Sequence, residues 1–160
     1  WMTLCQATEV VALVAMGYLI VRWPLRKLFI GAMIFALGRF AFNAIGAHTE
    51  TILPLFVGLG FAGVAWAIFF EGGRIFVDRR VEVGLRAQAQ ALLSLATMTL
   101  GTIVGTILVE ILWVRLVGEK GAGGREDWAL YWWVLTGVSA LALAVYVIGG
   151  KSSRSAGSRI

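Results

Sequence analysis

Long apolar stretches recur along the chain, and short segments rich in polar residues separate them. Each stretch approaches the length of about 20 helical residues that crosses a hydrocarbon core of about 30 Å. None of them alternates between apolar and polar positions as a barrel strand does, and a helix satisfies its backbone hydrogen bonds internally. We therefore predict an all-α fold, a polytopic membrane helical bundle with five transmembrane helices, at residues 2–21, 28–45, 52–77, 88–114 and 128–149.

The composition of the chain supports a lipid environment. Hydrophobic residues make up 59% of the sequence and charged residues only 14%, and the mean hydropathy is +0.85. A soluble domain of this size has too little interior to hide so many apolar side chains. Residues 151–160 differ because they are rich in Ser, Gly and Arg, and we expect them to form a disordered cytoplasmic tail.

The net charge of +5 resides in the connections between the apolar stretches. Nine Lys and Arg residues follow the first, third and fifth stretches, and three lie between the fourth and the fifth. The positive-inside bias places the richer set and the C-terminus in the cytoplasm, so we expect a multi-pass protein of the cell inner (plasma) membrane. Basic loops beside anionic lipid account for the charge, and we expect no nucleic-acid partner. The nine residues are Arg22, Arg26, Lys27, Arg79, Arg80, Arg86, Lys151, Arg154 and Arg159.

Two polar residues of the first stretch, Gln6 and Glu9, are the first candidates for function. They are three positions apart and share one helix face about midway through the bilayer. Ionisable groups at this depth are costly and mark binding or proton sites, so the pair suits a small polar ligand near the midplane. The alternative is structural: Arg39 reaches the same depth on the next stretch, and a buried Glu9–Arg39 ion pair would fix two antiparallel neighbours. Asn43 lies level with Gln6 by the same count.

The third stretch ends in an acidic, basic and acidic series. Glu71, Arg74 and Asp78 follow one another at spacings of three and four residues, so they form one stripe along a helix. We favour a charge network that shapes an inner gate. Direct binding of substrate or of a proton by Glu71 is the alternative.

No motif of a soluble enzyme occurs in the chain, which has no G-x-S-x-G, no H-E-x-x-H and no Walker lysine loop. The single cysteine, Cys5, excludes an internal disulfide, and we expect it to serve in packing. We therefore expect no enzymatic activity, no catalytic residue, no cofactor and no metal site.

The run from Arg74 to Gln90 contains Phe-Val-Asp-Arg followed by Leu-Arg-Ala-Gln-Ala-Gln. It resembles the connection between helices 10 and 11 of the nucleoside:proton symporter family, within the major facilitator superfamily. The residues that fit are Phe76, Val77, Asp78, Arg79, Leu85, Arg86, Ala87, Ala89 and Gln90. The segment from Gln6 to Glu9 is similar to that family's Q-x-x-E on helix 8, and Arg22 to Lys27 is similar to its basic turn between helices 8 and 9.

The resemblance implies a partial major facilitator fold, in which the five stretches are helices 8 to 12 of a longer, twelve-helix protein. It implies a fragment of a proton-coupled secondary active transporter that takes up nucleosides by alternating access. The expected partners are a nucleoside or similar small polar solute, protons, the lipid bilayer and the N-terminal half of the same transporter. Two alternatives stay open: a major facilitator transporter of another small polar solute such as a sugar, and a non-transporting membrane scaffold.

The resemblance also implies roles for single residues, with one departure. The family often has an aromatic residue followed by an acid in helix 10, and here that place reads Trp66-Ala67. Trp66 is able to stack on a base, whereas the missing acid leaves the substrate open. We expect substrate binding at Gln6, Glu9, Trp66 and Asn43, proton coupling at Glu9 and Glu71, and a gating or charge network at Arg39, Arg74, Asp78 and Arg86.

Overall fold

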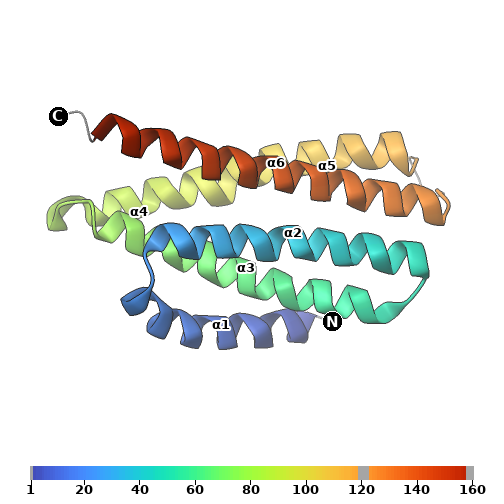
Figure 1. The fold of residues 1–160 in the computed structure, drawn as a ribbon, viewed down its shortest axis with the longest axis horizontal. Coiled ribbons are helices and arrows are strands. Elements are labelled where there is room, and N and C mark those ends of the chain that lie inside the picture. The colour runs from blue at the N-terminus through green and yellow to red at the C-terminus, as the bar shows by residue number, and fades with distance from the viewer. Residues whose placement is uncertain (1, 119–122, 158–160) are drawn as a thin grey trace.

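The structure, a computed structural model, describes residues 2–118 and 123–157. The described residues form helices and connections, with no strand among them (Figure 1). The elements are α1 (Met2–Arg22), α2 (Leu25–Thr49), α3 (Ile52–Asp78), the short 3-10 turn η1 (Val83–Leu85), α4 (Arg86–Ser94), the π-helical segment η2 (Leu95–Gly101), α5 (Thr102–Leu116) and α6 (Arg125–Gly157).

Four segments of the described chain are long and apolar enough to cross a membrane: 25–49, 52–78, 83–116 and 125–149. The predicted all-α membrane bundle is therefore confirmed. The first predicted stretch also folds as a helix of 21 residues, α1, and its membrane crossing stays a prediction.

Local sequence signals set the ends of the first helices. Pro24 stands just before α2 with φ −64° and ψ 140°, the extended conformation that ends one helix and starts another. Glu50 closes α2 in the left-handed conformation, with φ 53°, and Thr51 returns the chain to extended geometry before α3. Because charged residues do not interrupt a helical backbone, α2 begins earlier and ends later than the apolar stretch 28–45.

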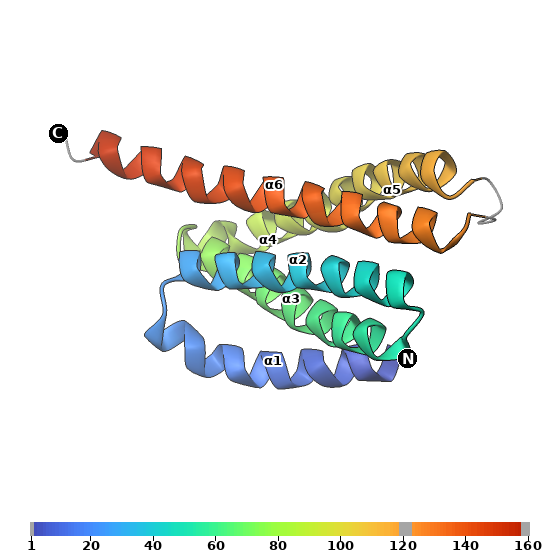
Figure 2. The ribbon, with the colours of Figure 1, turned by 45° about the vertical axis from the view of Figure 1, so that its right-hand side comes forward.

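The packing order of the helices differs from their order in the chain. α2 lies between α3 and α6, whereas α1 packs mainly on α3 and meets α2 near the turn that joins them (Figures 1 and 2). This corrects the expectation that α1 and α2 are packed neighbours. A short loop makes two consecutive helices antiparallel, but it does not determine which neighbouring helix the first one packs against.

Helix α3 is the most buried element, because small residues let its neighbours approach closely. A Cβ atom added to Gly58 would lie 2.7 Å from Asn43 Oδ1 and 3.0 Å from the backbone oxygen of Arg39 on α2. On the α1 side, Met16 packs with Leu28 of α2 and with α3 in one apolar cluster.

The last two membrane segments pack more loosely. Helices α4, η2 and α5 form one continuous segment in which α4 contacts α3 and α5 contacts α6. Trp113 at the end of α5 meets Trp128 and Tyr131 of α6 edge to face, at ring-centroid distances of 4.7 and 6.1 Å. The sequence predicted the segment at 88–114 but gave no sign of the π-helical stretch inside it.

The C-terminal end of α6 continues further than the apolar stretch 128–149. The helix runs to Gly157, so residues 151–157 are helical where we expected disorder. No proline stands between Gly149 and that point, so nothing in the covalent chain stops the helix. Residues 158–160, the rest of the expected tail, lie outside the described residues.

Replacing Gly58 by alanine is expected to lower the free energy of unfolding by about 1–3 kcal/mol, because the added methyl group overpacks the contact between α2 and α3. The control is Gly31→Ala, where the new Cβ meets open space and helix propensity favours alanine by up to about 1 kcal/mol. Thermal unfolding of the purified protein in detergent measures both changes. Equal stability of the two variants would contradict the close approach at Gly58.

Candidate functional site

The predicted polar pair of α1 is only partly covered. The Gln6 side chain is exposed and that of Glu9 is half-buried, and within the described residues neither makes a hydrogen bond or an ion pair. Their helix rests on α3 at Gly60, where an added Cβ would lie 3.6 Å from the methyl group of Thr8. The two polar groups are therefore available to a ligand rather than engaged in packing.

The structural alternative, an ion pair between Glu9 and Arg39, does not form among the described residues. Within the described residues, the ion pairs are Glu71–Arg74 at 2.9 Å and Glu50–Arg125 at 3.7 Å. The reason is the packing order, since α1 covers α3 and does not lie beside α2. The Arg39 guanidinium instead lies over the ring of its neighbour Phe40, 5.4 Å from the ring centroid.

Asn43 is likewise separated from Gln6. Its side-chain oxygen faces Gly58 of α3, whereas Thr8, beside Gln6 on α1, lies next to Gly60. Successive residues turn by about 100° in a helix, so Gly58 and Gly60 face nearly opposite directions. The structure thus places Asn43 and Gln6 on different sides of α3.

Trp66 and Arg39 do come together, around one cavity of about 230 Å³ between α2 and α3. The Trp66 ring is 49% exposed and lies 4.1 Å from the ring of Phe70, measured between centroids. Ala67, at the place of the missing acid, is 1% exposed. Trp66 therefore offers an open aromatic face, while the next position is closed by packing.

The predicted charge stripe at the end of α3 forms only in part. Glu71 accepts a hydrogen bond from Arg74 at 2.9 Å, and both side chains are substantially exposed. Asp78 does not join this pair. Its Oδ1 accepts a hydrogen bond from Gln90 Nε2 at 2.9 Å, and the same amide nitrogen lies 2.9 Å from the backbone oxygen of Arg74, to which it also donates.

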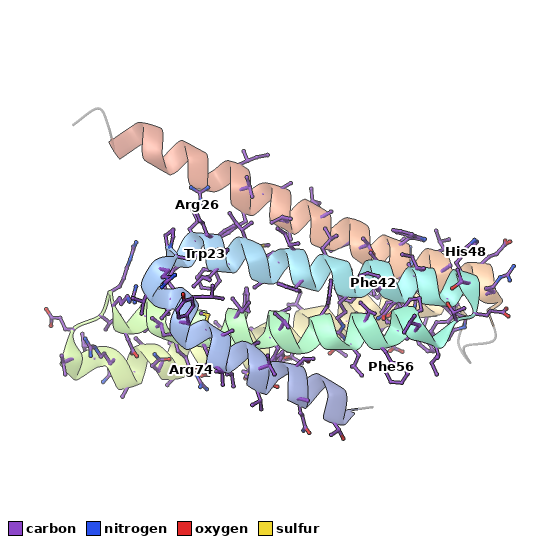
Figure 3. The ribbon with its side chains drawn as sticks, turned by 60° about the horizontal axis from the view of Figure 1, so that its bottom comes forward. Trp23, Arg26, Phe42, His48, Phe56 and Arg74 are labelled. Carbon is purple, nitrogen blue, oxygen red and sulfur yellow. The ribbon has the colours of Figure 1, made fainter. Side chains whose placement is uncertain are left out.

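Gln90 was missed as a site residue, although it closes the run of residues that carries the family resemblance. It stands four positions, one helical turn, after Arg86, whose Nε donates to the backbone oxygen of Val81 at 3.3 Å. The two side chains tie the start of α4 to the end of α3 and to the turn between them. Figure 3 shows Arg74 at this end of the bundle, far from His48 at the other.

These contacts are individually weak. Exposed ion pairs contribute about 0–1 kcal/mol, and single hydrogen bonds about 0.5–1.5 kcal/mol.

No group of three or more His, Cys, Asp or Glu side chains that could hold a metal ion gathers in the part of the chain that the structure describes.

Comparison with solved structures shows that the chain shares its helical fold with part of a known membrane protein. The chain superposes on two crystal structures of the nucleoside transporter NupG with TM-scores of 0.80 and 0.78 and 22% sequence identity. The match covers 92% of this chain and 36% of NupG.

Sequence relatives agree with the fold. The chain is 25% identical to Escherichia coli YegT over 157 residues, which are 96% of this chain and 37% of YegT. It is also 25% identical to the E. coli xanthosine permease, over 94% of this chain and 35% of that protein. A third relative, the E. coli nucleoside permease NupG, matches at 25% identity over 88% of this chain and 33% of its own length.

A sequence model of the nucleoside H+ symporter family matches residues 1–155, and the chain belongs to this family. The family resemblance seen in the sequence is thereby confirmed. The chain spans only about a third of the length of these curated relatives.

Replacing Gln90 by alanine is expected to speed amide hydrogen exchange in α4 by about 5- to 30-fold. The variant loses two hydrogen bonds worth about 1–2 kcal/mol together. The locally open state from which amides exchange becomes more populated by the corresponding factor. Gln88→Ala is the matched control, because Gln88 is exposed and makes no hydrogen bond to another described residue. Exchange followed by mass spectrometry compares them, and equal rates in both variants would argue against the contact.

Proposed function

We propose that the chain is the C-terminal part of a proton-coupled nucleoside transporter that works by alternating access. The observation that carries the proposal is the Gln6–Glu9 pair, two polar side chains on one face of an apolar helix with their hydrogen-bonding groups unengaged among the described residues. Family membership and the permeases among the relatives support the same reading. We assign the chain no enzymatic activity.

The proposed roles follow from the chemistry of each side chain. The Gln6 amide hydrogen-bonds the base or ribose, and the Glu9 carboxylate binds the coupled proton. Trp66 stacks on the base with its exposed face. Asn43 faces Gly58 on the other side of α3 from Gln6, so we do not assign it to the same solute.

The end of the bundle near Asp78 is the proposed inner gate. Gln90 of α4 donates to Asp78 and to the backbone oxygen of Arg74 on α3, and Arg86 donates to Val81 in the turn. These contacts are weak enough to break and re-form in a transport cycle. Glu71 is the second candidate for proton coupling, because it lies in the same network.

The proposed location is the inner (plasma) membrane, with the C-terminus in the cytoplasm. The connection between α1 and α2, the turn between α3 and α4 and the C-terminal end of α6 all lie at one end of the bundle (Figure 1). These segments are rich in Lys and Arg, so one end of the bundle carries most of the positive charge of the connections. The positive-inside bias assigns that end to the cytoplasm. The proposed partners are protons, a nucleoside, the lipid bilayer and the N-terminal half of the transporter.

A second candidate function is transport of another small polar solute, such as a sugar. The observation that favours it is Ala67, which is buried where the family pattern has an acid, so one polar contact of the pattern is absent. A non-transporting scaffold is the remaining alternative, and uptake measurements separate all three.

Replacing Glu9 by glutamine is expected to abolish proton-gradient-dependent uptake of labelled nucleoside into proteoliposomes, while nucleoside binding persists, because the amide keeps the shape of the side chain but does not titrate. Glu82→Gln, in the exposed turn before α4, is the control and should transport normally. The full-length transporter is used in both cases. Unchanged coupling in Glu9→Gln would remove Glu9 from the mechanism, and no uptake of any solute by the unaltered protein would favour the scaffold.

Replacing Trp66 by alanine is expected to weaken nucleoside binding by about tenfold or more, since stacking on an aromatic ring is worth about 1–3 kcal/mol per base. Trp66→Phe should retain most of the affinity. Trp133→Ala is a matched control, because Trp133 is also 49% exposed but lies on α6. Isothermal titration with a nucleoside and a sugar measures the effect, and tighter binding of the sugar would favour the second candidate function.

A further inference from the structure

Four polar side chains lie along one side of the continuous helix formed by η2 and α5, and they are named here the polar stripe. Its members are Thr99, Thr102, Thr106 and Glu110, at spacings of three, four and four residues. Residues at these spacings are neighbours on a helix surface. All four are exposed, and neither the proposed binding site nor the proposed gate includes them.

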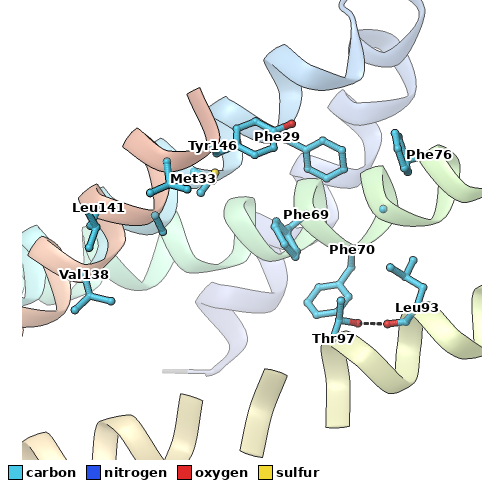
Figure 4. Close-up of a pocket in the computed structure, with 13 residues that line it drawn as sticks. Phe29, Met33, Phe69, Phe70, Phe76, Leu93, Thr97, Val138, Leu141 and Tyr146 are labelled. Carbon is cyan, nitrogen blue, oxygen red and sulfur yellow. Dashed lines mark hydrogen bonds between the residues drawn. The ribbon is translucent and has the colours of Figure 1, made fainter. Parts of the chain in front are cut away.

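The hydroxyl groups of the polar stripe differ from those of other threonines in the bundle. A threonine in an apolar helix is able to satisfy its hydroxyl by donating to the backbone oxygen four residues earlier. Thr97 donates to Leu93 in this way at 2.7 Å (Figure 4), and Thr136 donates to Trp132 at 2.9 Å. The three threonines of the polar stripe make no such bond within the described residues. Their hydroxyl groups are therefore left to hydrogen-bond something outside these helices.

Glu110 is the charged member of the polar stripe, and within the described residues it takes part in no ion pair. It lies six residues, or about 9 Å, before the end of α5 at Leu116. Thr102 lies fourteen residues, or about 21 Å, before the same end. The polar stripe thus extends from the middle of the crossing toward the end of the bundle opposite the Lys- and Arg-rich connections (Figure 1).

Hydrocarbon does not suit this face of the helix. An unpaired carboxylate inside a membrane segment is costly, and such residues face a bundle interior or a water-filled cavity. Lipid has another side of α5 to cover, where Val104, Ile107 and Ile111 are exposed. Because each residue turns the helix by about 100°, these three side chains lie about 100–160° around it from Thr106.

A packed helix does not suit the polar stripe either. Close helix contact in membranes uses small residues, and those of this segment, Gly101 and Gly105, lie about 100° or more around the helix from Thr106. A Cβ atom added to Gly105 would meet no atom within 4 Å, so that side is open to a neighbour. Water remains as the neighbour that satisfies three hydroxyl groups and a carboxylate together.

We propose that the polar stripe lines a water-filled passage of the transporter, and that Glu110, near the mouth of this passage, makes it selective for uncharged or cationic solutes over anionic ones. A phosphate monoester, which carries about 1.5–2 negative charges at pH 7, is repelled by the carboxylate. The inference rests on the proposed function only in taking the chain as part of a solute transporter. Its tests use neither a solute nor a proton gradient, so a protein that moves no nucleoside but passes them would refute the proposed function alone.

Cysteine labelling in the full-length transporter tests the passage. The native cysteines, Cys5 among them, are replaced by alanine, and single variants Thr102→Cys, Thr106→Cys, Ile107→Cys and Ile111→Cys are made. A membrane-impermeant, charged methanethiosulfonate should modify the two stripe positions about tenfold or more faster than the two isoleucine positions, because hydrocarbon excludes a charged reagent. Melting temperatures check that each variant folds. Equal rates at all four positions, or no modification at either stripe position, would overturn the passage.

The charge of Glu110 is tested one helical turn away, in Thr106→Cys, by the ratio of the labelling rates of a cationic and an anionic methanethiosulfonate. Adding Glu110→Gln should lower this ratio by about tenfold, since a unit charge at about 6 Å changes each rate about threefold, in opposite directions, even in water. Glu126→Gln, at an exposed position near the start of α6, is the control and should leave the ratio unchanged. A ratio that Glu110→Gln does not lower would remove Glu110 from selectivity.

Discussion

Hydrocarbon offers no hydrogen bond to a backbone amide and no solvation to a charge, and this constraint shapes every part of the protein. It makes each membrane segment a helix, including the irregular segment 95–101, where the turn widens but the backbone stays internally bonded. It also removes the hydrophobic driving force between helices, so close packing has to come from small residues. The glycines of α3 supply it, which is why α3 lies at the centre and its neighbours arrange themselves around it.

The same constraint separates the polar groups into three settings. Gln6 and Glu9 stand partly open on α1, where a solute is able to replace water as their hydrogen-bonding partner. Arg39 lies over the ring of Phe40, beside the cavity between α2 and α3. Asp78 and Gln90, where α3 meets α4, bond to each other near the membrane surface, where water competes. The groups proposed for binding and those proposed for gating thus lie at different depths of one bundle.

The sequence predicted what depends on local chemistry. Apolar runs placed the helices, and the motifs around Asp78 and Gln6 indicated the family. Contacts between helices were not predictable in the same way. The Glu9–Arg39 ion pair, which was the structural alternative, does not form, because depth along a helix says nothing about which helix lies alongside. Gln90 was overlooked because its role depends on the angle at which α4 meets α3, and that angle follows from a turn and not from residue spacing.

The π-helical stretch lies between two differently attached halves of one membrane crossing. Below it, α4 is fixed to α3 by side-chain bonds, and above it α5 is fixed to α6 by the interlocked rings of Trp113, Trp128 and Tyr131. A helix bends most readily where its ladder of backbone hydrogen bonds is irregular. Residues 95–101 are therefore the point at which this membrane crossing would bend if α3 and α6 shifted relative to each other.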